Sequence, residues 1–557
     1  MLSRKAASVA AALAAALLAV ALIVSVRGEL PARSGQAAAA SVGLPERPDI
    51  VLVLMDDFSL ELLATMPQGR RMQRQGADFV NAYVVNSLCC PSRAATLTGL
   101  PPHLNGVLTN TSDGPGGRQG GYAAFAEHGN PAKAFNVSLE RAGYRTGFVG
   151  KYLNEYEPPR FGGTLPVLPG WTDIEAVTGA AYNGWGFDRF QKQGERMVPI
   201  SYPRPDASAS AAAKDASYAG TVVADAAVAM AQRYEAAGDP YFLYVAPYAT
   251  HESITPAWPG EPLFPPAFRD RPGGPAGPQG NCGRRACPSL TTRDLAGFGD
   301  PTGDNRPTRV SKGGGTRPAP SWRFTRHRMS APEAERHLRD RARMAQSIDR
   351  MVARLRAAVG DDAYVLLTSD NGFHLGQHGL GGGKGTPYDS DVHVPLLVTG
   401  PGIEPGRRPV VTTNLDLAPT IEGLAGARPV APRAGTSLVP ALQDRGAGTG
   451  RYAFVEHTRG PVLPGEPDAD AGTGGRLDAI PSYVAVRSRR GLLVRLDVDD
   501  RWDRQRFVWE LYDYRSLGWE KRNTYATQRR EAWVRDLSAR LKDWADCTTA
   551  ECRRLTS

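Results

Sequence analysis

The chain has 557 residues, of which 41% are hydrophobic and 22% are charged. These proportions are those of an ordinary globular protein, so they exclude a wholly disordered or fibrous chain. With 66 Lys and Arg against 57 Asp and Glu, the net charge of +9 is a mild excess for this length. The excess favours an anionic partner only weakly and does not by itself indicate a protein that binds nucleic acid.

Residues 1–45 have the pattern of a targeting segment followed by a linker. Basic residues at positions 4 and 5 precede an apolar run over 6–26, and small residues follow at 37–40. A basic start, an apolar stretch and an A-x-A-like site are typical of a secretory signal peptide. The run is also long enough to span a bilayer, so an uncleaved signal anchor is the alternative. We expect a secreted or cell-envelope protein, attached to a membrane only if this segment stays uncleaved.

Short β-rich runs alternate with helix-like segments through the middle of the chain. The predicted strands are Ile50–Leu54, Thr146–Val149, Tyr241–Ala246, Tyr364–Thr368 and Pro395–Val398, and the predicted helices include Thr221–Tyr234 and Ala331–Val359. Such alternation predicts an α/β fold with a parallel sheet covered by helices on both faces. The many arginines of the helix over 331–359 are interpreted as a solvated face.

Two changes in composition predict the organisation of the rest. Residues from about 255 to 325 are rich in Pro, Gly and Arg and are predicted to form a long surface insertion. A Pro-, Gly- and Ala-rich stretch after about residue 425 predicts a boundary between a larger domain, 46–425, and a C-terminal α+β subdomain, 426–557. In the subdomain we predict antiparallel strands over Ser482–Val486, Gly491–Leu496 and Phe507–Tyr512, and a helix over Arg529–Trp544.

The six cysteines fall into three pairs. The pairs at positions 282/287 and 547/552 share the spacing C-x4-C in polar loops. In an exported protein this pattern indicates two local disulfides. Cys89 and Cys90 are adjacent, and because neighbouring cysteines rarely bond to each other, this pair needs another explanation.

Polar side chains follow four of the predicted strands where each strand ends. They are Asp56 with Asp57, Lys151, His251, and Asp370 with Asn371. Ligands bind at the carboxyl ends of the strands in open α/β sheets, so we expect these side chains to meet at one rim. Three carboxylates and an amide suit Ca²⁺ or Mg²⁺ better than Zn²⁺. The alternative for each acid alone is a cap of the helix that follows.

The segment Leu88–Arg93, with the sequence LCCPSR, opens another predicted helix. Proline is favourable at an early helical position, and the helix N-terminus offers free N–H groups to an anion. A cysteine at such a position is expected to have a lowered pKa and to be able to act as a nucleophile. The alternative is a buried pair of cysteines before an ordinary helix.

The motif Cys89-x-Pro91-Ser92-Arg93, followed by Leu97-Thr98-Gly99, resembles the signature of the formylglycine-dependent type I sulfatases. The resemblance covers roughly residues 47–425. Its further segments, in chain order, are Met55-Asp56-Asp57, Gly150-Lys151-Tyr152-Leu153-Asn154, the His251 region, Thr368-Ser369-Asp370-Asn371-Gly372 and Gly383-Lys384. The sequence DNGFHLG at 370–376 and the LCCPSR and GKYLN segments are most similar to the N-acetylglucosamine-6-sulfatase-like or arylsulfatase subgroup. The resemblance implies an alkaline-phosphatase-like fold, with a mixed, mostly parallel sheet between helices.

The resemblance also implies a set of functional residues. A separate maturation enzyme would oxidise Cys89 to formylglycine, whose hydrated aldehyde attacks sulfur. The implied ligands of a divalent cation, Ca²⁺ or alternatively Mg²⁺, are Asp56, Asp57, Cys89, Asp370 and Asn371. By the same resemblance, Arg93 would orient the site, and Lys151 and Lys384 would bind sulfate oxygens. His251 would protonate the leaving oxygen. His374 and Asn154 would make further contacts to the substrate.

Two positions depart from the family's pattern. Ser253 stands where the family often has a proline two residues after the histidine, which leaves a neutral loop histidine as the alternative role for His251. Leu153 stands where many sulfatases have a histidine, and for this reason the hydrogen-bonding role is assigned to the following residue, Asn154.

The predicted function is hydrolysis of a sulfate ester on a sulfated carbohydrate or an aryl sulfate. One alternative is a phosphonate monoester or phosphodiester hydrolase, because those relatives share the fold and the nucleophile motif. Another is a catalytically inactive protein that binds sulfated glycans. The expected partners are a sulfated small molecule or glycan and the maturation enzyme, and no nucleic acid.

Overall fold

The computed structural model describes residues 46–111, 119–299, 305–320, 328–448, 450–458, 480–498, 506–517 and 519–557. These residues belong to one compact unit, Leu44–Ser557. The predicted targeting segment, 1–45, lies outside the described residues, so the signal peptide and the anchor both stay predictions. None of the helices in the described ranges is long and apolar enough to cross a membrane.

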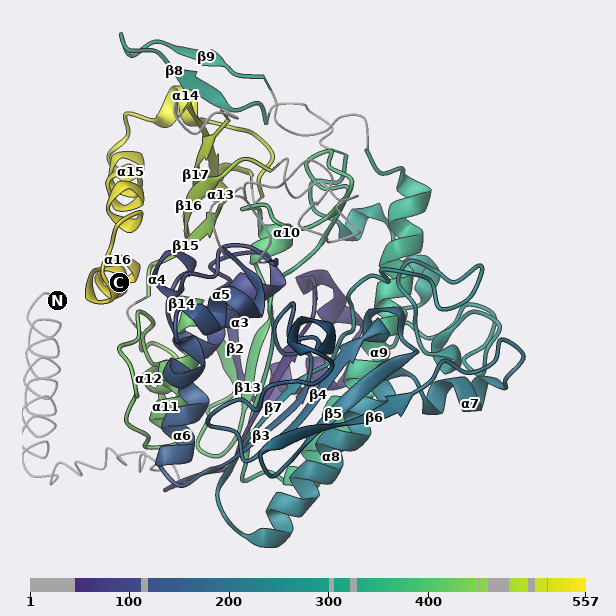
Figure 1. The fold of residues 1–557 in the computed structure, drawn as a ribbon. Helices are drawn as coiled ribbons and strands as arrows, with labels where there is room; N and C mark the ends of the chain where they lie inside the picture. The colour runs from purple at the N-terminus through teal and green to yellow at the C-terminus, as the bar shows by residue number, and fades with distance from the viewer. Residues whose placement is uncertain are drawn as a thin grey trace, which may run out of the picture. The chain divides into compact units, whose positions relative to one another are not determined.

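A ten-stranded sheet runs through the unit in the order β14-β2-β13-β10-β1-β7-β3-β4-β5-β6 (Figure 1). The strands are β1 Ile50–Met55, β2 Ala77–Tyr83, β3 Arg145–Gly150, β4 Asp173–Gly179, β5 Phe187–Gln193, β6 Arg196–Tyr202, β7 Tyr241–Ala246, β10 Tyr364–Ser369, β13 Leu396–Thr399 and β14 Gly406–Thr413. The central strands β10, β1, β7, β3 and β4 pair in parallel, whereas β13, β5 and β6 pair antiparallel with their neighbours. The predicted mixed, mostly parallel sheet is confirmed.

Helices cover both faces of this sheet, as predicted (Figure 1). Successive residues of a strand point to opposite faces. Val51 and Val53 of β1 therefore pack in one core cluster with α2 (Pro67–Gln75), α8 (Ala219–Ala237) and α9 (Ala331–Val359). Their neighbours Ile50 and Leu52 pack in a second cluster with α3 (Cys89–Thr98), α5 (Gly121–Glu127), α6 (Phe135–Arg141), α11 (Leu417–Leu424) and α12 (Val439–Gln443). Every residue of β1, β7 and β10 is buried, which explains their continuous apolar sequences.

A second, antiparallel sheet has the order β15-β16-β17-β18-β8-β9. Its strands are β15 Tyr452–His457, β16 Tyr483–Ser488, β17 Gly491–Asp497, β18 Phe507–Asp513, β8 Thr308–Val310 and β9 Thr316–Pro318. The predicted C-terminal antiparallel sheet is confirmed, and α15 (Ala532–Trp544) packs on it through Trp544, whose ring lies 4.3 Å from that of Phe454. The segment predicted as a surface insertion also contributes to this sheet, because β8 pairs with β18. The boundary near residue 425 stays a prediction.

The remaining described elements are short. They are the helices α4 Pro102–Asn105, α7 Ala211–Ala216, α10 Asp389–Val392, α13 Tyr514–Leu517, α14 Tyr525–Gln528 and α16 Thr549–Thr556, and the two-stranded pair β11 His374–Leu375 and β12 Gly382–Gly383. Both predicted disulfides, Cys282–Cys287 and Cys547–Cys552, are present, and Cys89 and Cys90 are free and buried.

The arginines of α9 do not form a uniformly solvated face, so that interpretation is wrong. Arg341 is 0% exposed and Arg343 is also buried, whereas Arg354 is half exposed and pairs with Asp225. The apolar stripe of α9, which includes Ile348, faces the sheet in the first core cluster.

Substitution Ile348→Ala should lower the free energy of unfolding by about 2–5 kcal/mol, because it removes buried methyl groups and leaves a cavity between α9 and the sheet. The matched control is Ile254→Ala, since Ile254 is 53% exposed, and here we expect a change within about 0.5 kcal/mol. Chemical denaturation of the two variants measures both values. Equal effects would contradict the placement of Ile348 in the core.

Candidate active site

The polar segments that follow β1, β3, β7 and β10 meet at one rim of the ten-stranded sheet. These strands are neighbours in the order β10-β1-β7-β3 and run parallel, so their carboxyl ends lie at the same edge. The side chains brought together there are Asp56, Asp57, Lys151, His251, Asp370 and Asn371, each at most 2% exposed. The structure therefore places all six strand-end residues in one buried group.

Cys89 faces this group from the first turn of α3. Its Sγ lies 3.6 Å from Oδ1 of Asp56 and 3.6 Å from Oδ1 of Asp57. The Nζ of Lys384, which directly follows β12, lies 2.7 Å from the same sulfur. Cys90 instead belongs to the apolar cluster on the other side of the helix. Of the two adjacent cysteines, Cys89 is the one that contacts the acids.

The thiol of Cys89 does not have the lowered pKa that its position at a helix N-terminus suggested. Burial raises the pKa of Cys89 well above its usual value, and the nearby charges of Lys151 and Lys384 offset this only in part. The unmodified thiol is therefore held neutral. A neutral thiol is a weak nucleophile, so this expectation from the sequence is wrong.

Arg93 connects three of the strand ends. Its Nε donates to Oδ2 of Asp370 (2.8 Å) and its Nη1 donates to the carbonyl oxygen of Lys151 (2.8 Å). Its Nη2 lies 3.6 Å from Oδ1 of Asp56. Although burial opposes its charge, Asp370 and Asp56 raise the pKa of Arg93 well above its usual value. The guanidinium thus remains charged and fixes the carboxylates after β1 and β10.

The two other cations of the group pair with the two acids after β1. Lys151 Nζ donates to both carboxylate oxygens of Asp56, at 2.9 and 2.8 Å, and Lys384 Nζ donates to Oδ1 of Asp57 at 2.6 Å. Burial alone would raise the pKa of Asp56, but Lys151 and the other surrounding cations lower it below its usual range. For Asp370 burial is the larger effect and raises the pKa to about 6, against the attraction of Arg93.

The oxygen atoms of the group fit a hard divalent cation. Asn371 donates through Nδ2 to Oδ1 of Asp57 (2.6 Å), which turns its own Oδ1 away from that bond. This Oδ1 and the Oδ2 of Asp57 are buried and have no hydrogen-bond partner among the described residues. Single potential ligand atoms of Asp56, Asp57, Cys89 and His251 lie within 4.8 Å of one another. Carboxylate and amide oxygens are the ligands that Ca²⁺ and Mg²⁺ prefer, so the donor set agrees with the expected cation.

His251 is oriented by the backbone. Its Nδ1 lies 2.8 Å from the carbonyl oxygen of Glu252, which can only accept, so Nδ1 carries a proton. Nε2 consequently faces the acids and lies 3.6 Å from Oδ2 of Asp57. The ring of Tyr182 packs beside the imidazole, with 4.5 Å between the ring centroids.

The two predicted substrate contacts lie outside this inner group. His374 Nδ1 lies 2.9 and 3.0 Å from the two carboxylate oxygens of Asp391, which also accepts a bond from the backbone N–H of Thr386 near Lys384. Asn154 has a buried Oδ1 without a hydrogen-bond partner among the described residues. The roles of both residues stay predictions.

Sequence reasoning missed Arg341, which donates to the carbonyl oxygen of Asp57 and to Ser59 Oγ (2.9 Å). Arg341 stands in a helix crowded with charged residues, and nothing in its local pattern distinguishes a buried arginine from a solvated one. It is separated from Asp57 by 284 positions, so only the tertiary structure brings them together.

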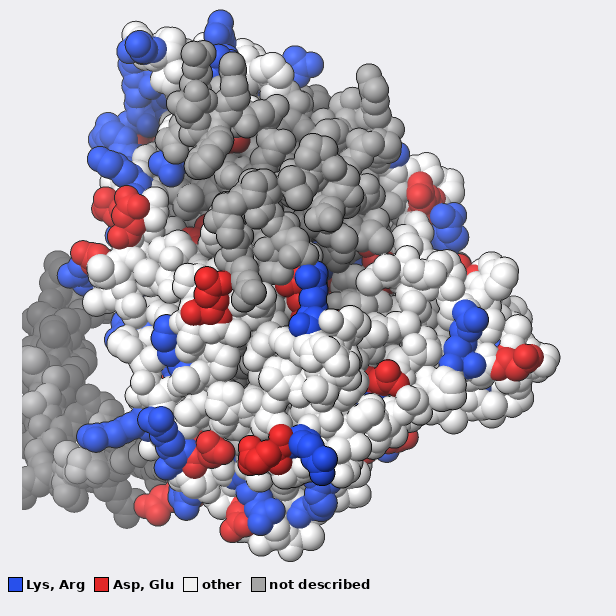
Figure 2. Space-filling view, in the orientation of Figure 1, with Lys and Arg blue, Asp and Glu red and all other residues white. Residues whose placement is uncertain are grey.

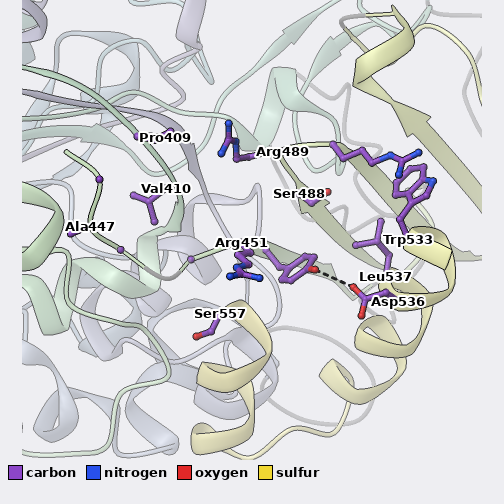
Figure 3. A pocket seen from close by; sticks show the side chains of 15 residues that line it. Pro409, Val410, Ala447, Arg451, Ser488, Arg489, Trp533, Asp536, Leu537 and Ser557 are labelled. Atoms are coloured by element: carbon purple, nitrogen blue, oxygen red, sulfur yellow. Dashed lines mark hydrogen bonds between the residues drawn. The ribbon is translucent and has the colours of Figure 1, made fainter. Parts of the chain in front are cut away.

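The charge of the surface adds little to this picture. In Figure 2, Lys and Arg side chains gather at the upper left of the described surface, and lower on the visible face they are interspersed with Asp and Glu. A separate hollow of about 760 Å³ lies between β14, the segment after α12 and α15, lined by Arg451, Arg489 and Trp533 among others (Figure 3). None of the predicted site residues lines this hollow.

Curated proteins similar in sequence to this chain are named as sulfatases. The chain is 30% identical to an arylsulfatase of Volvox carteri over 71% of this chain and 58% of that protein. It is 28% identical to an N-acetylglucosamine-6-sulfatase of Capra hircus over 68% of this chain and 60% of that protein. The chain thus spans about three fifths of the length of these curated relatives.

The fold has counterparts among solved structures. One is BT4656 in complex with its substrate D-glucosamine-2-N,6-O-disulfate, which has a TM-score of 0.60 and 20% sequence identity and covers 91% of this chain and 98% of that chain. At this identity the likeness concerns the fold alone. The family model of the sulfatases matches residues 48–427, which include every strand-end residue, Cys89 and Lys384. The chain therefore belongs to the sulfatase family.

Proposed function

We propose that this chain is a sulfuric ester hydrolase that releases sulfate from a sulfated carbohydrate or an aryl sulfate. The observation that carries the proposal is the position of Cys89, with Sγ 3.6 Å from Asp56 and Asp57 and 2.7 Å from Lys384 Nζ. Attack on a sulfate ester needs positive charge beside the nucleophile, and Lys384 and the acids that could hold a metal ion lie next to Cys89. The names of the two curated relatives support the substrate class.

The nucleophile would be Cys89 after its oxidation to formylglycine by a separate maturation enzyme. The buried, neutral thiol supports this step, because the unmodified side chain is a weak nucleophile. Formylglycine would supply a hydrated aldehyde, whose hydroxyl group is the attacking oxygen.

A divalent cation would be held by Asp56, Asp57, Asp370 and Asn371, together with residue 89. Ca²⁺ is proposed, with Mg²⁺ as the alternative, because all the protein donors are oxygens. Such a cation would act as a Lewis acid toward a sulfate oxygen. The support is the pair of buried oxygen atoms of Asp57 and Asn371 that have no hydrogen-bond partner in the described structure.

The chain's own cations would bind the sulfate group. Lys384 and Lys151 carry their charges next to Cys89 and Asp56, where they can donate hydrogen bonds to sulfate oxygens. Charges that are already in place when the reaction starts stabilise developing negative charge without reorganisation. Arg93 would not bind the substrate itself but would keep Asp370 and Asp56 in position.

His251 would donate the proton that the leaving alcohol needs. Its Nδ1 proton is engaged by the carbonyl oxygen of Glu252, so the exchangeable position is Nε2, which faces the acid group. A positioned general acid contributes roughly 10²–10⁴-fold to a rate. His374, which Asp391 orients, and Asn154 are proposed as contacts to the remainder of the substrate.

Export of the protein is part of the proposal. Two disulfides agree with an oxidising compartment, since structural disulfides are rare where thiols are kept reduced. The segment over 1–45 would be cleaved as a signal peptide or retained as an anchor.

Peptide mass spectrometry of protein from its native host should find residue 89 with the mass loss of a thiol replaced by an aldehyde. Substitution Cys89→Ala should lower kcat/KM toward an aryl sulfate by at least about 10³-fold, because the nucleophile is lost. The control is Cys90→Ala, which changes a neighbouring buried cysteine and should keep most of the activity. An unmodified thiol at residue 89 in active protein would refute the proposed nucleophile.

Turnover of an aryl sulfate should exceed that of the matching aryl phosphate diester and aryl phosphonate monoester. The sulfate monoester presents a single negative charge with three terminal oxygens to Lys151 and Lys384. Steady-state kcat/KM for the three esters with the same leaving group makes the comparison. Preference for the phosphonate would instead establish a phosphonate hydrolase, and binding of sulfated glycans without turnover of any ester would establish an inactive binding protein.

Exhaustive chelation should remove at least about 90% of the activity, and Ca²⁺ should restore it, because the carboxylates need the cation to bind substrate. The variant Asn371→Ala should need a higher Ca²⁺ concentration for half-maximal activity, by about 10-fold. Atomic emission spectroscopy of the protein before and after chelation is the control. Full activity in protein shown to be free of metal would contradict the cation site.

A further inference from the structure

Arg341 is completely buried in the first half of α9, and its guanidinium donates to four acceptors. Nη1 donates to Ser59 Oγ at 2.9 Å and to the carbonyl oxygen of Phe373 at 3.4 Å. Nη2 donates to the carbonyl oxygen of Asp57 and, at 3.3 Å, to Oγ1 of Thr250. A single side chain thus contacts residues that lie far apart in the sequence.

The four acceptors belong to the segments that follow three strands, β1, β7 and β10. Each of these segments carries a residue of the proposed site at or near the acceptor. Asp57 is itself an acceptor, His251 directly follows Thr250, and Asn371 lies two residues before Phe373. Movement of any one segment relative to the others would therefore break a bond to Arg341.

The guanidinium plane is fixed from several sides. Ser59 Oγ donates to the carbonyl oxygen of Phe373 (2.8 Å) and accepts from its backbone N–H (3.1 Å), which closes a ring of bonds with Arg341. The guanidinium carbon lies 4.8 Å from the centroid of the Phe373 ring. Arginine suits this place because its planar fork can satisfy several acceptors at once.

The charge of Arg341 is not explained by an ion pair. Among the described residues, the acceptors of its guanidinium are two carbonyl and two hydroxyl oxygens, none of them a carboxylate. Burial lowers its pKa, although arginine remains protonated in proteins. Removing a charged side chain from water costs free energy, and bonds to neutral oxygens offset that cost only in part. A neutral hydrogen-bond donor could link the three segments without this cost. The nearby acids, Glu61 first and then Asp57, attract the charge and offset part of the cost of its burial.

Asp57 shows what the bond to Arg341 holds. Its φ of +54° is in the left-handed region, which is uncommon for residues other than glycine, although Asp adopts it more often than most. The backbone is held at both ends, because its N–H donates to Oδ1 of Asp370 (3.1 Å) and its carbonyl oxygen accepts from Arg341. In this conformation the side chain reaches Asn371 and Lys384.

We propose that Arg341 is a positioning residue of this site, which holds the segments after β1, β7 and β10 so that Asp57, His251 and Asn371 meet around residue 89. The inference rests on the proposed function and adds a residue that does not itself touch the substrate or the cation.

The test compares Arg341→Met and Arg341→Lys with Arg354→Met, which makes the same change at an exposed arginine of the same helix. Circular dichroism of the full chain checks folding, calorimetry measures the Kd of Ca²⁺, and turnover of an aryl sulfate gives kcat and KM. For Arg341→Met we expect about 10–100-fold weaker Ca²⁺ binding and a similar fall in kcat, because residues that orient ligands have effects of this size. At saturating Ca²⁺, KM should stay within about threefold, since the contacts to the substrate, including that of the cation, remain. Arg341→Lys, which keeps the charge and part of the donors, should recover some of both losses.

Amide hydrogen exchange of the segments 56–60, 249–253 and 370–374 completes the test, because it requires neither cation nor turnover. All three segments should exchange faster in Arg341→Met than in Arg354→Met. If Arg341→Met folds and has the same Ca²⁺ affinity, kcat and amide exchange as Arg354→Met, the proposal is overturned. If Arg341→Met does not fold, a folded Arg341→Lys with unchanged Kd, kcat and exchange would overturn it. Wild-type protein that hydrolyses no sulfate ester would refute the proposed function, and Ca²⁺ binding and exchange would still decide the role of Arg341.

Discussion

Three carboxylates can lie buried at one rim of the sheet only because cations from elsewhere in the chain meet them there. Asp56 and Asp57 are adjacent, and Asp370 follows the neighbouring strand, so their mutual repulsion in a medium of low polarity would otherwise favour protonation. Arg93 comes from α3, Lys151 from the end of β3 and Lys384 from the end of β12. The positions of these three elements relative to β1 are therefore constraints that the entire fold has to satisfy.

The predictable part of the fold is the part that is buried on both sides. The strands β1, β7 and β10 have unbroken apolar sequences because both faces are covered, and these runs were recognised to within one or two residues. The strands β5 and β6 contain charged residues and a proline, and they are strands because they pair with each other and with β4. The three-residue strands β8 and β9 pair with each other, and β8 pairs with β18, which lies about 200 residues later. No local sequence pattern therefore predicts them. The antiparallel direction of β13 is likewise a property of the pairing and not of its sequence.

The residues of the candidate site also differ in how far the sequence predicts them. Residues that directly follow an apolar strand, such as Asp56 and Asp370, could be placed at the rim from chain order and the general rule for open sheets. Lys384 follows a strand of two residues and was indicated only by resemblance to a family. No local pattern indicates the role of Arg341, because its environment is created by three segments distant in the sequence. The helix N-terminus alone predicts a lowered pKa for Cys89, but burial of the side chain outweighs it and raises the pKa.

The complete burial of Cys89 has a consequence for the order of events when the protein is made. A maturation enzyme cannot reach a side chain that is 0% exposed, so the proposed oxidation has to precede the packing of α3 against the sheet. Lys384, which closes over the sulfur, lies 295 positions further along the chain. At roughly 5–20 residues per second, the ribosome needs about 15–60 s to synthesise that distance. The long separation between residue 89 and Lys384 therefore gives a period during synthesis in which a second protein can reach residue 89, before the chain that encloses it has been made.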